Sequence, residues 1–139
     1  MISHRSFLDN ESARLDLAYS IVLSGNLNID EYHENTIDKA FKDGHYYCDK
    51  APGLSLAATP LLFAGKTLFP NRIWHPGDPA ANYLLILILI SLPSAIVIPL
   101  MAAAVKKIAG GSAVFPLFAY ALGSLAFPYS TLFYDHQFS

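Results

Sequence analysis

A carboxylate and an ammonium stand side by side at Asp49-Lys50, within the sequence Gly-His-Tyr-Tyr-Cys-Asp-Lys-Ala-Pro-Gly of residues 44–53. Three aromatic rings precede the pair at positions 45–47, and a long apolar run begins after it. An acid and a lysine just ahead of a membrane-like segment can meet a phosphate at a bilayer surface, because a lysine ammonium is a point charge that suits phosphate. The alternative interpretation is a tight hairpin with a surface ion pair.

Two long runs that follow carry no charge, residues 79–105 and 108–134. Uncharged runs of 18 or more apolar residues are typical of bilayer spans. We therefore expect an all-α integral membrane protein in which residues 83–139 form a transmembrane helical hairpin, with spans over 83–105 and 114–133. Residues 1–82 form the other predicted region, an outer loop domain.

Lysines 106 and 107 lie in the short connection between the two expected spans. Positive residues in short loops stay in the cytoplasm, so this turn is predicted to be cytoplasmic and residues 1–82 to be extracytoplasmic. The end of the chain then lies on the same outer side. Five chemically capable side chains can therefore meet at one membrane face: Glu11, Asp49, Lys50, Asp135 and His136.

Such a set suits a transfer reaction on a lipid-borne phosphate. A carboxylate can act as general base on an acceptor hydroxyl or amine, and the lysine can hold the leaving phosphate. A second carboxylate with a histidine could bind a divalent metal ion. The alternatives are ordinary ones: a helix-start charge at Glu11, a surface ion pair at Asp49-Lys50, and an exposed polar end to a span at Asp135-His136.

Four elements are expected to position these residues. Residues 11–24 have the spacing of an amphipathic helix, which could pack on protein or lie on a membrane surface. Asp43-Gly44 predicts a type I′ turn between strands at 36–41 and 45–48. Residues 54–69 read as an interfacial or half-buried helix, and residues 26–37 and 70–82 as loops.

Several function classes are disfavoured. The net charge of −2 comes without a basic stripe, so nucleic acid is not an expected partner. A single cysteine, Cys48, excludes an intramolecular disulfide framework. The sequence contains no Gly-rich phosphate loop, no His-Glu-x-x-His and no Gly-x-Ser-x-Gly motif.

Three stretches resemble one enzyme family: Asn-Glu-Ser-Ala-Arg at 10–14, the segment 44–53, and Phe-Pro-Tyr-Ser-Thr-Leu-Phe at 127–133. They are similar to bacterial glycosyltransferases of the GT-C type, a group with protein O-mannosyltransferases and lipid A aminoarabinose transferases. Members are multi-spanning membrane enzymes that move a sugar from a polyprenyl-phosphate carrier to an acceptor outside the cytoplasm. The resemblance implies a fragment with this activity, similar to the amino-terminal third of such an enzyme without its first span.

The family's outer loop carries an acid-x-x-Arg element and a Tyr-x-acid-Lys-x-Pro element. By position, the resemblance implies that Glu11 is the catalytic base, and that Lys50, together with Arg14 and Tyr46, binds the carrier phosphate. A second set of roles is implied near the outer face: Asp49 and His136 as ligands of a divalent metal ion, and Asp135 as a further catalytic acid. Glu11 stands where aspartate is more usual in the family.

The expected partners are a polyprenyl-phosphate-linked sugar, the lipid bilayer, and a further chain that supplies the missing spans. The expected location is the inner membrane, as a multi-pass protein. The alternative function is a non-catalytic two-span membrane protein whose outer loop binds a partner or the membrane surface.

Overall fold

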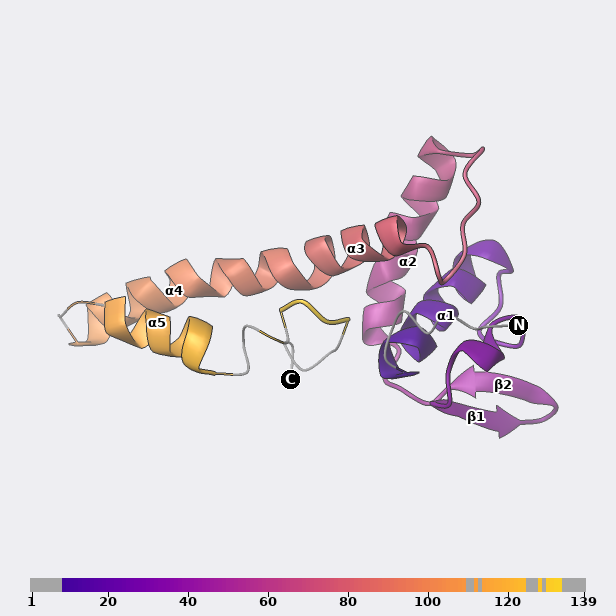
Figure 1. Cartoon of the computed structure of the whole chain (residues 1–139), viewed down its shortest axis with the longest axis horizontal. Coiled ribbons are helices and arrows are strands. Elements are labelled where there is room, and N and C mark those ends of the chain that lie inside the picture. Colours follow the sequence, from indigo (N-terminus) through magenta and orange to yellow (C-terminus); the bar gives the residue numbers. More distant parts are fainter. Residues whose placement is uncertain (1–8, 110–111, 113, 125–127, 129, 134–139) are drawn as a thin grey trace. The chain divides into compact units, whose positions relative to one another are not determined.

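The computed structural model describes residues 9–109, 112, 114–124, 128 and 130–133. The described chain is mostly helical, with one two-stranded sheet, and divides into two compact units, Met1–Leu85 and Ile86–Ser139. Figure 1 shows the elements of both units. In chain order they are α1 (Asp9–Leu23), η1 (His33–Asn35), β1 (Lys39–Lys42), β2 (His45–Cys48), α2 (Gly53–Leu68), α3 (Pro79–Ile86), η2 (Leu87–Ser91), α4 (Leu92–Ala109) and α5 (Val114–Gly123).

Helix α1 is the core of the first unit. Apart from Ser12, every residue from Glu11 to Ser20 is buried, charged and apolar residues alike. The helix packs against α2 and also contacts η1 and β2. The expected helix is confirmed, and of its two expected positions the structure shows packing on protein. Only the expectation of a single apolar face is wrong, because almost every residue from 11 to 20 is buried.

The segment between α1 and the sheet explains this burial, because it supplies hydrogen bonds to polar side chains of α1. The Ser20 hydroxyl donates to the Asn28 carbonyl at 2.5 Å, and the Asn35 amide donates to the Asp16 carboxyl at 3.0 Å. Buried polar groups are stable when they have such partners. The polar side of α1 thus faces protein instead of water.

The hairpin is confirmed. Strands β1 and β2 pair antiparallel, with Lys42 opposite His45 across a two-residue loop. Asp43 and Gly44 have φ angles of 51° and 86°, as a type I′ turn requires of both central residues. The first strand begins at Lys39, three residues later than expected.

Helix α2 begins directly after Pro52 and has the predicted half-buried character. One side is buried, with Leu54, Ala58 and Leu62 in the core. On the other side Leu56 and Phe63 are 52% and 63% exposed. The described residues leave that apolar side uncovered.

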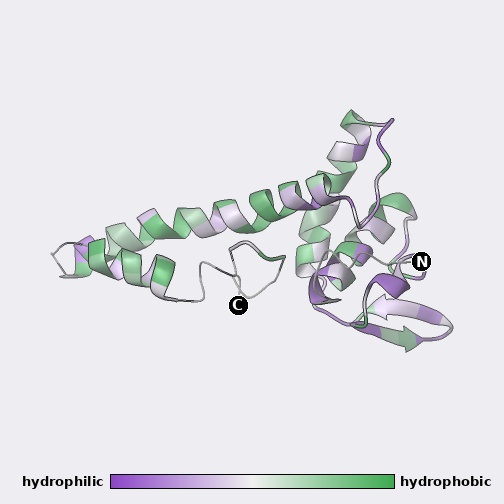
Figure 2. Ribbon diagram, in the orientation of Figure 1, coloured by the Kyte–Doolittle hydropathy of each residue, from purple (hydrophilic) through white to green (hydrophobic). Residues whose placement is uncertain are grey.

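The first expected span is longer than predicted. A continuous helix runs from Pro79 to Ile108, and it is long and apolar enough to cross a membrane. Thirty residues at 1.5 Å each reach about 45 Å, beyond the ~30 Å of a hydrocarbon core. Figure 2 shows that hydrophobic residues dominate this helix.

The helix starts four residues early because Asp78 caps it. Its Oδ1 accepts hydrogen bonds from the amides of Ala80 at 3.1 Å and Ala81 at 3.3 Å. Pro79 occupies the first helical position, where its missing N–H costs nothing. The Asp-Pro pair therefore starts the helix, and residues 79–82 are not part of the loop.

A π-helical turn interrupts this helix at η2, just before Pro93. The Leu92 amide donates to the Leu87 carbonyl, five residues back. Proline has no N–H and its ring collides with the carbonyl four residues earlier, so a wider turn accommodates it.

The second expected span is wrong as a single helix over 114–133. Helix α5 ends at Gly123, and residues 124 and 130–133 have bend and turn geometry. Its ten residues reach about 15 Å, half of what a span needs. Gly123 has low helix propensity, which is consistent with the helix ending there. Among the described residues, only the helix from Pro79 to Ile108 is long and apolar enough to cross a membrane.

Candidate functional site

The Arg14 side chain ties α1 to the loop between β2 and α2. Its Nη1 donates to the Ala51 carbonyl at 3.0 Å, and its Nε donates to Asn10 Oδ1 at 3.0 Å. The Ser55 hydroxyl donates to the Arg14 carbonyl at 2.8 Å from the first turn of α2. These bonds fix the short loop that carries Lys50.

Lys50 sits between two carboxylates. Its Nζ lies 3.2 Å from Asp49 Oδ1 and 3.4 Å from Asp38 Oδ2. The hydrogen bond with Asp49 and the charge of Asp38 raise the pKa of Lys50 against an opposing effect of desolvation. The side chain is 24% exposed, so a charged ammonium lies within reach of a ligand in solution.

Tyr46 belongs to a different cluster. Its ring stacks on His33, with centroids 4.3 Å apart and planes 1° from parallel, and it meets Phe41 at 4.9 Å. The Lys39 ammonium lies 5.3 Å from the ring centroid. The structure thus brings Arg14 and Asp49 to the Lys50 loop and places Tyr46 in this aromatic cluster.

Asp30 anchors the hairpin, although it was expected only to lie in the loop over residues 26–37. Its Oδ1 accepts the Tyr46 amide at 2.7 Å, and its Oδ2 lies 2.6 Å from His45 Nδ1. The amide of Tyr46 and then the His45 ring lower the pKa of Asp30. A carboxylate that clamps a strand in this way fixes where the hairpin points.

The predicted catalytic acids fall in two places. Glu11 is 4% exposed on α1, one turn before Arg14. Asp135 and His136 lie outside the residues that the structure describes.

The described residues do not form a site for the predicted divalent metal ion. Among them, no three side chains of His, Cys, Asp or Glu gather as a metal would need. Both oxygens of Asp49 face the Lys50 ammonium, at 3.2 and 3.4 Å. The Asp49 carboxylate is thus engaged with a cation already, and the divalent ion stays a prediction through which no step is derived.

Asp16 is a buried acid that the sequence analysis missed. It is fully buried, and burial raises its pKa from 3.8 to about 7, against lowering by the Asn35 amide and the Lys39 charge. Oδ1 accepts from Asn35, while Oδ2 has no hydrogen-bond partner among the described residues. The available signal was its place between Leu15 and Leu17, two apolar residues of α1.

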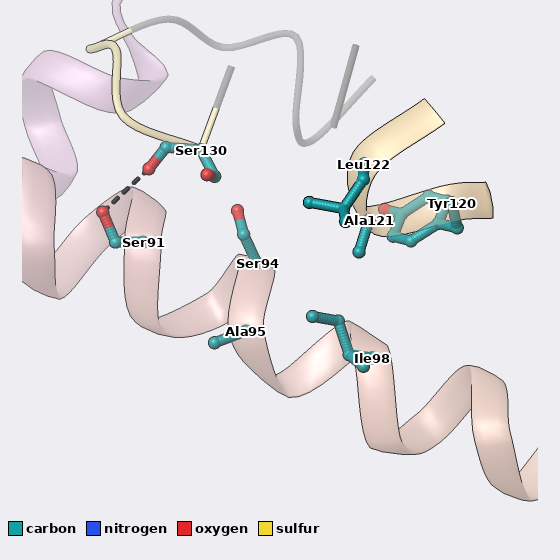
Figure 3. A pocket seen from close by; sticks show the side chains of 8 residues that line it. All are labelled: Ser91, Ser94, Ala95, Ile98, Tyr120, Ala121, Leu122 and Ser130. Atoms are coloured by element: carbon teal, nitrogen blue, oxygen red, sulfur yellow. Dashed lines mark hydrogen bonds between the residues drawn. The ribbon is translucent and has the colours of Figure 1, made fainter. Parts of the chain in front are cut away.

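The second unit contains a cavity of about 160 Å³ beside the π-helical turn (Figure 3). The Ser91 hydroxyl donates to the Ser130 carbonyl and the Ser94 hydroxyl to the Ile90 carbonyl, each at 2.7 Å. These two protons are therefore not offered to a ligand. The lining residues are Ser91, Ser94, Ala95, Ile98, Tyr120, Ala121, Leu122 and Ser130.

The chain matches no protein-family model, and no curated protein or solved structure shows significant similarity to it.

Proposed function

We propose that this chain is part of a membrane glycosyltransferase that moves a sugar from a polyprenyl-phosphate carrier to an extracytoplasmic acceptor. The observation that carries the proposal is Lys50. It is a charged and partly exposed ammonium on a loop that Arg14 fixes in place. A fixed point charge at the surface is the feature that a carrier phosphate needs.

In the proposed reaction the acceptor oxygen or nitrogen attacks the anomeric carbon of the sugar, and the bond between that carbon and the phosphate oxygen breaks. The acceptor proton passes to the Glu11 carboxylate, and the polyprenyl phosphate leaves with its charge held by Lys50. Arg14 supports this step by holding the Ala51 carbonyl. Asp135 and His136 keep their proposed roles as a second acid and a metal ligand.

The charges around Lys50 also define how a phosphate would enter. Asp38 and Asp49 lie at 3.4 and 3.2 Å from the ammonium, so an incoming phosphate competes with both carboxylates. Exposed and partly exposed ion pairs contribute little stability, about 0–1 kcal/mol, because water screens them. The phosphate of the sugar donor can therefore replace them at a small cost, and the leaving polyprenyl phosphate carries one further negative charge for Lys50 to hold.

We further propose that the helix from Pro79 to Ile108 crosses the inner membrane, with Lys106 and Lys107 at its cytoplasmic end. Residues 1–82 then lie outside the cytoplasm, and α5 begins a return passage. The support is the length and apolar character of the helix, and the two lysines in its last turn.

The uncovered side of α2 favours a second candidate function, a non-catalytic membrane protein whose outer domain binds a bilayer surface. Leu56, Phe63 and Leu68 are between 52% and 73% exposed, and Lys66 provides a cation near the end of the same helix. An apolar side with a basic residue is typical of helices that lie in a membrane interface. On this view Lys50 is replaceable, whereas Phe63→Ser reduces binding to anionic lipid vesicles.

Lys50→Gln is expected to weaken binding of polyprenyl phosphate to the detergent-purified chain. Loss of a charged hydrogen bond costs roughly 1.5–3 kcal/mol, which corresponds to about 10–100-fold in the dissociation constant. The measurement is a titration followed by the fluorescence of Trp74, the single tryptophan, or by calorimetry.

Lys42→Gln is the matched control, because Lys42 is exposed at the end of β1 and the substitution removes the same charge from the neighbouring hairpin. It should bind within about twofold of wild type. Equal losses in both variants, or none in Lys50→Gln, would remove Lys50 from the proposed phosphate site.

A further inference from the structure

Asp16 makes a hydrogen-bonded contact between α1 and the segment that leads to Asp38. Its Oδ1 accepts the Asn35 side-chain amide at 3.0 Å. Thr36 is buried, and its hydroxyl accepts the Asp38 amide at 3.0 Å. Asp38 in turn lies 3.4 Å from the Lys50 ammonium. A continuous set of contacts therefore runs from the buried acid to the proposed phosphate site.

The surroundings of Asp16 fit a neutral acid better than a carboxylate. The side chain is fully buried, and its Oδ2 has no hydrogen-bond partner among the described residues. The groups that face it are the Lys39 ammonium from β1 and the Tyr32 hydroxyl just before η1, and the burial of both acid and phenol favours their neutral forms. The Lys39 ammonium itself donates to the His33 carbonyl. An unpaired buried carboxylate is costly, so its proton stabilises this contact.

We propose that Asp16 is a positioning residue whose bond to Asn35 holds residues 33–38 on α1 while the buried acid is neutral, and that opening of this segment releases Asp38 from Lys50. The inference rests on the proposed role of Lys50 as the phosphate-binding group, because opening of residues 33–38 would regulate the access of a phosphate to Lys50. In the closed form Asp16 is neutral and Asp38 competes for Lys50. In the open form Asp16 is solvated and ionised, and Lys50 has one carboxylate fewer to exchange for a phosphate.

The pH dependence follows from the sign of the linkage. The closed form binds the Asp16 proton more tightly than the open form, so opening is hardest at low pH and becomes easier as pH rises to about 7. Above that value both forms are ionised and the dependence on this group ends.

The test is amide hydrogen exchange of the full chain in detergent micelles, at about pH 5 and about pH 8, after correction for intrinsic exchange rates. The reporting amides are those of Asn35, Asp38 and Lys39, which donate to Tyr32, Thr36 and Ile37. In wild type their protection is expected to fall at least about tenfold between the two conditions. The Leu56 amide, bonded to the Pro52 carbonyl in α2, serves as reference and should stay better protected than these three amides at both pH values, because it opens only when the whole unit unfolds.

Asp16→Asn places a neutral amide where the acid stands, with an oxygen for Asn35 and an NH₂ at the unpartnered position. It should keep high protection at both pH values. Glu34→Gln removes an exposed charge from the same segment and should retain the wild-type fall.

A flat wild-type profile, protection of these three amides equal to that of Leu56 at both pH values, or the same fall in Asp16→Asn would overturn the inference. The wild-type profile decides even if the variant folds poorly. Because exchange needs no ligand, the expected fall at residues 35–39 without any phosphate binding would support the inference and contradict the proposed function. Lys50-dependent binding with a flat profile would do the reverse.

Discussion

Asp16→Asn is expected to raise the free energy of unfolding of the first unit above neutral pH, where the wild-type chain carries a buried negative charge. The wild-type pKa of Asp16 is 3.8 in the unfolded chain and about 7 in the folded one. Wild-type stability therefore falls as pH rises from about 4 to about 7, on the order of 4 kcal/mol in total. The asparagine variant has no proton to lose and escapes this fall.

The measurement is chemical denaturation at about pH 4.5 and about pH 8, followed by Trp74 fluorescence. Trp74 reports on the first unit, because its ring lies against Gly65 of α2, where an added Cβ would come within 2.5 Å of it. The variant and wild type should have similar stability at the lower pH and diverge at the higher one. Asp43→Asn, which removes a charge from the exposed turn, should follow wild type at both. A variant that is destabilised equally at both pH values would show that Asp16 is a carboxylate in the folded chain.

Asp78→Ala is expected to destabilise the first unit by roughly 2–3 kcal/mol, because Asp78 has two tasks. It caps α3 through Oδ1, and both of its oxygens accept from Arg72 at 2.7–2.9 Å. Burial would raise the pKa of Asp78, but Arg72 and the amides of Ala81 and Ala80 lower it overall. This contribution is therefore present at neutral pH and is lost as pH falls through the folded pKa, opposite in sign to that of Asp16.

Asp78→Asn separates the two tasks, since asparagine also caps helices but carries no charge. It should cost less than the alanine variant, and Arg72→Ala should cost about the same as Asp78→Asn. Because the Arg72 side chain is 39% exposed, water screens its ion pair with Asp78 and reduces what that pair contributes to the free energy of unfolding. Melting curves followed by far-UV circular dichroism measure all three. An alanine variant as stable as wild type would contradict the capping account.

Local chemistry explains which elements were predictable. The hairpin follows from Asp43-Gly44 alone, because a type I′ turn depends on two adjacent residues with positive φ. The start of α2 follows from Pro52 in the same way. The start of α3 also depends on two adjacent residues, Asp78 and Pro79, but this pair is equally typical of a turn. Arg72, which binds the Asp78 carboxylate, is six residues away and was not recognised as its partner.

The environment of α1 was not predictable because its covering segment has no periodic pattern. Residues 24–38 are irregular and polar, and the polar side chains of Ser20, Asp16 and Arg14 look like solvent-facing groups. Their partners Asn28, Asn35 and Ala51 are seen only in the structure. Helix length in apolar sequence is similarly hard to predict, since hydropathy alone does not place the end of α5 at Gly123.

In the candidate site, too, the contacts between sequence neighbours were predictable and those between distant residues were not. The neighbours Asp49 and Lys50 follow from the sequence, whereas Asp38 reaches Lys50 only through the register of β1 with β2, which sets Lys39 opposite Cys48. Side chains alternate between the two sides of β2, and Tyr46 lies on the side where its ring stacks on His33. Asp135 and His136 lie outside the described residues, so their roles stay predictions.

The central claim is that Lys50 recognises the phosphate of a lipid carrier, and comparing polyprenyl phosphate with the uncharged polyprenol tests it most directly. Both ligands share the apolar tail, so the ratio of their dissociation constants isolates the contribution of the phosphate. Wild type and Lys42→Gln are predicted to prefer the phosphate by about 10–100-fold, and Lys50→Gln to bind both ligands nearly equally. A preference that survives unchanged in Lys50→Gln would contradict the account.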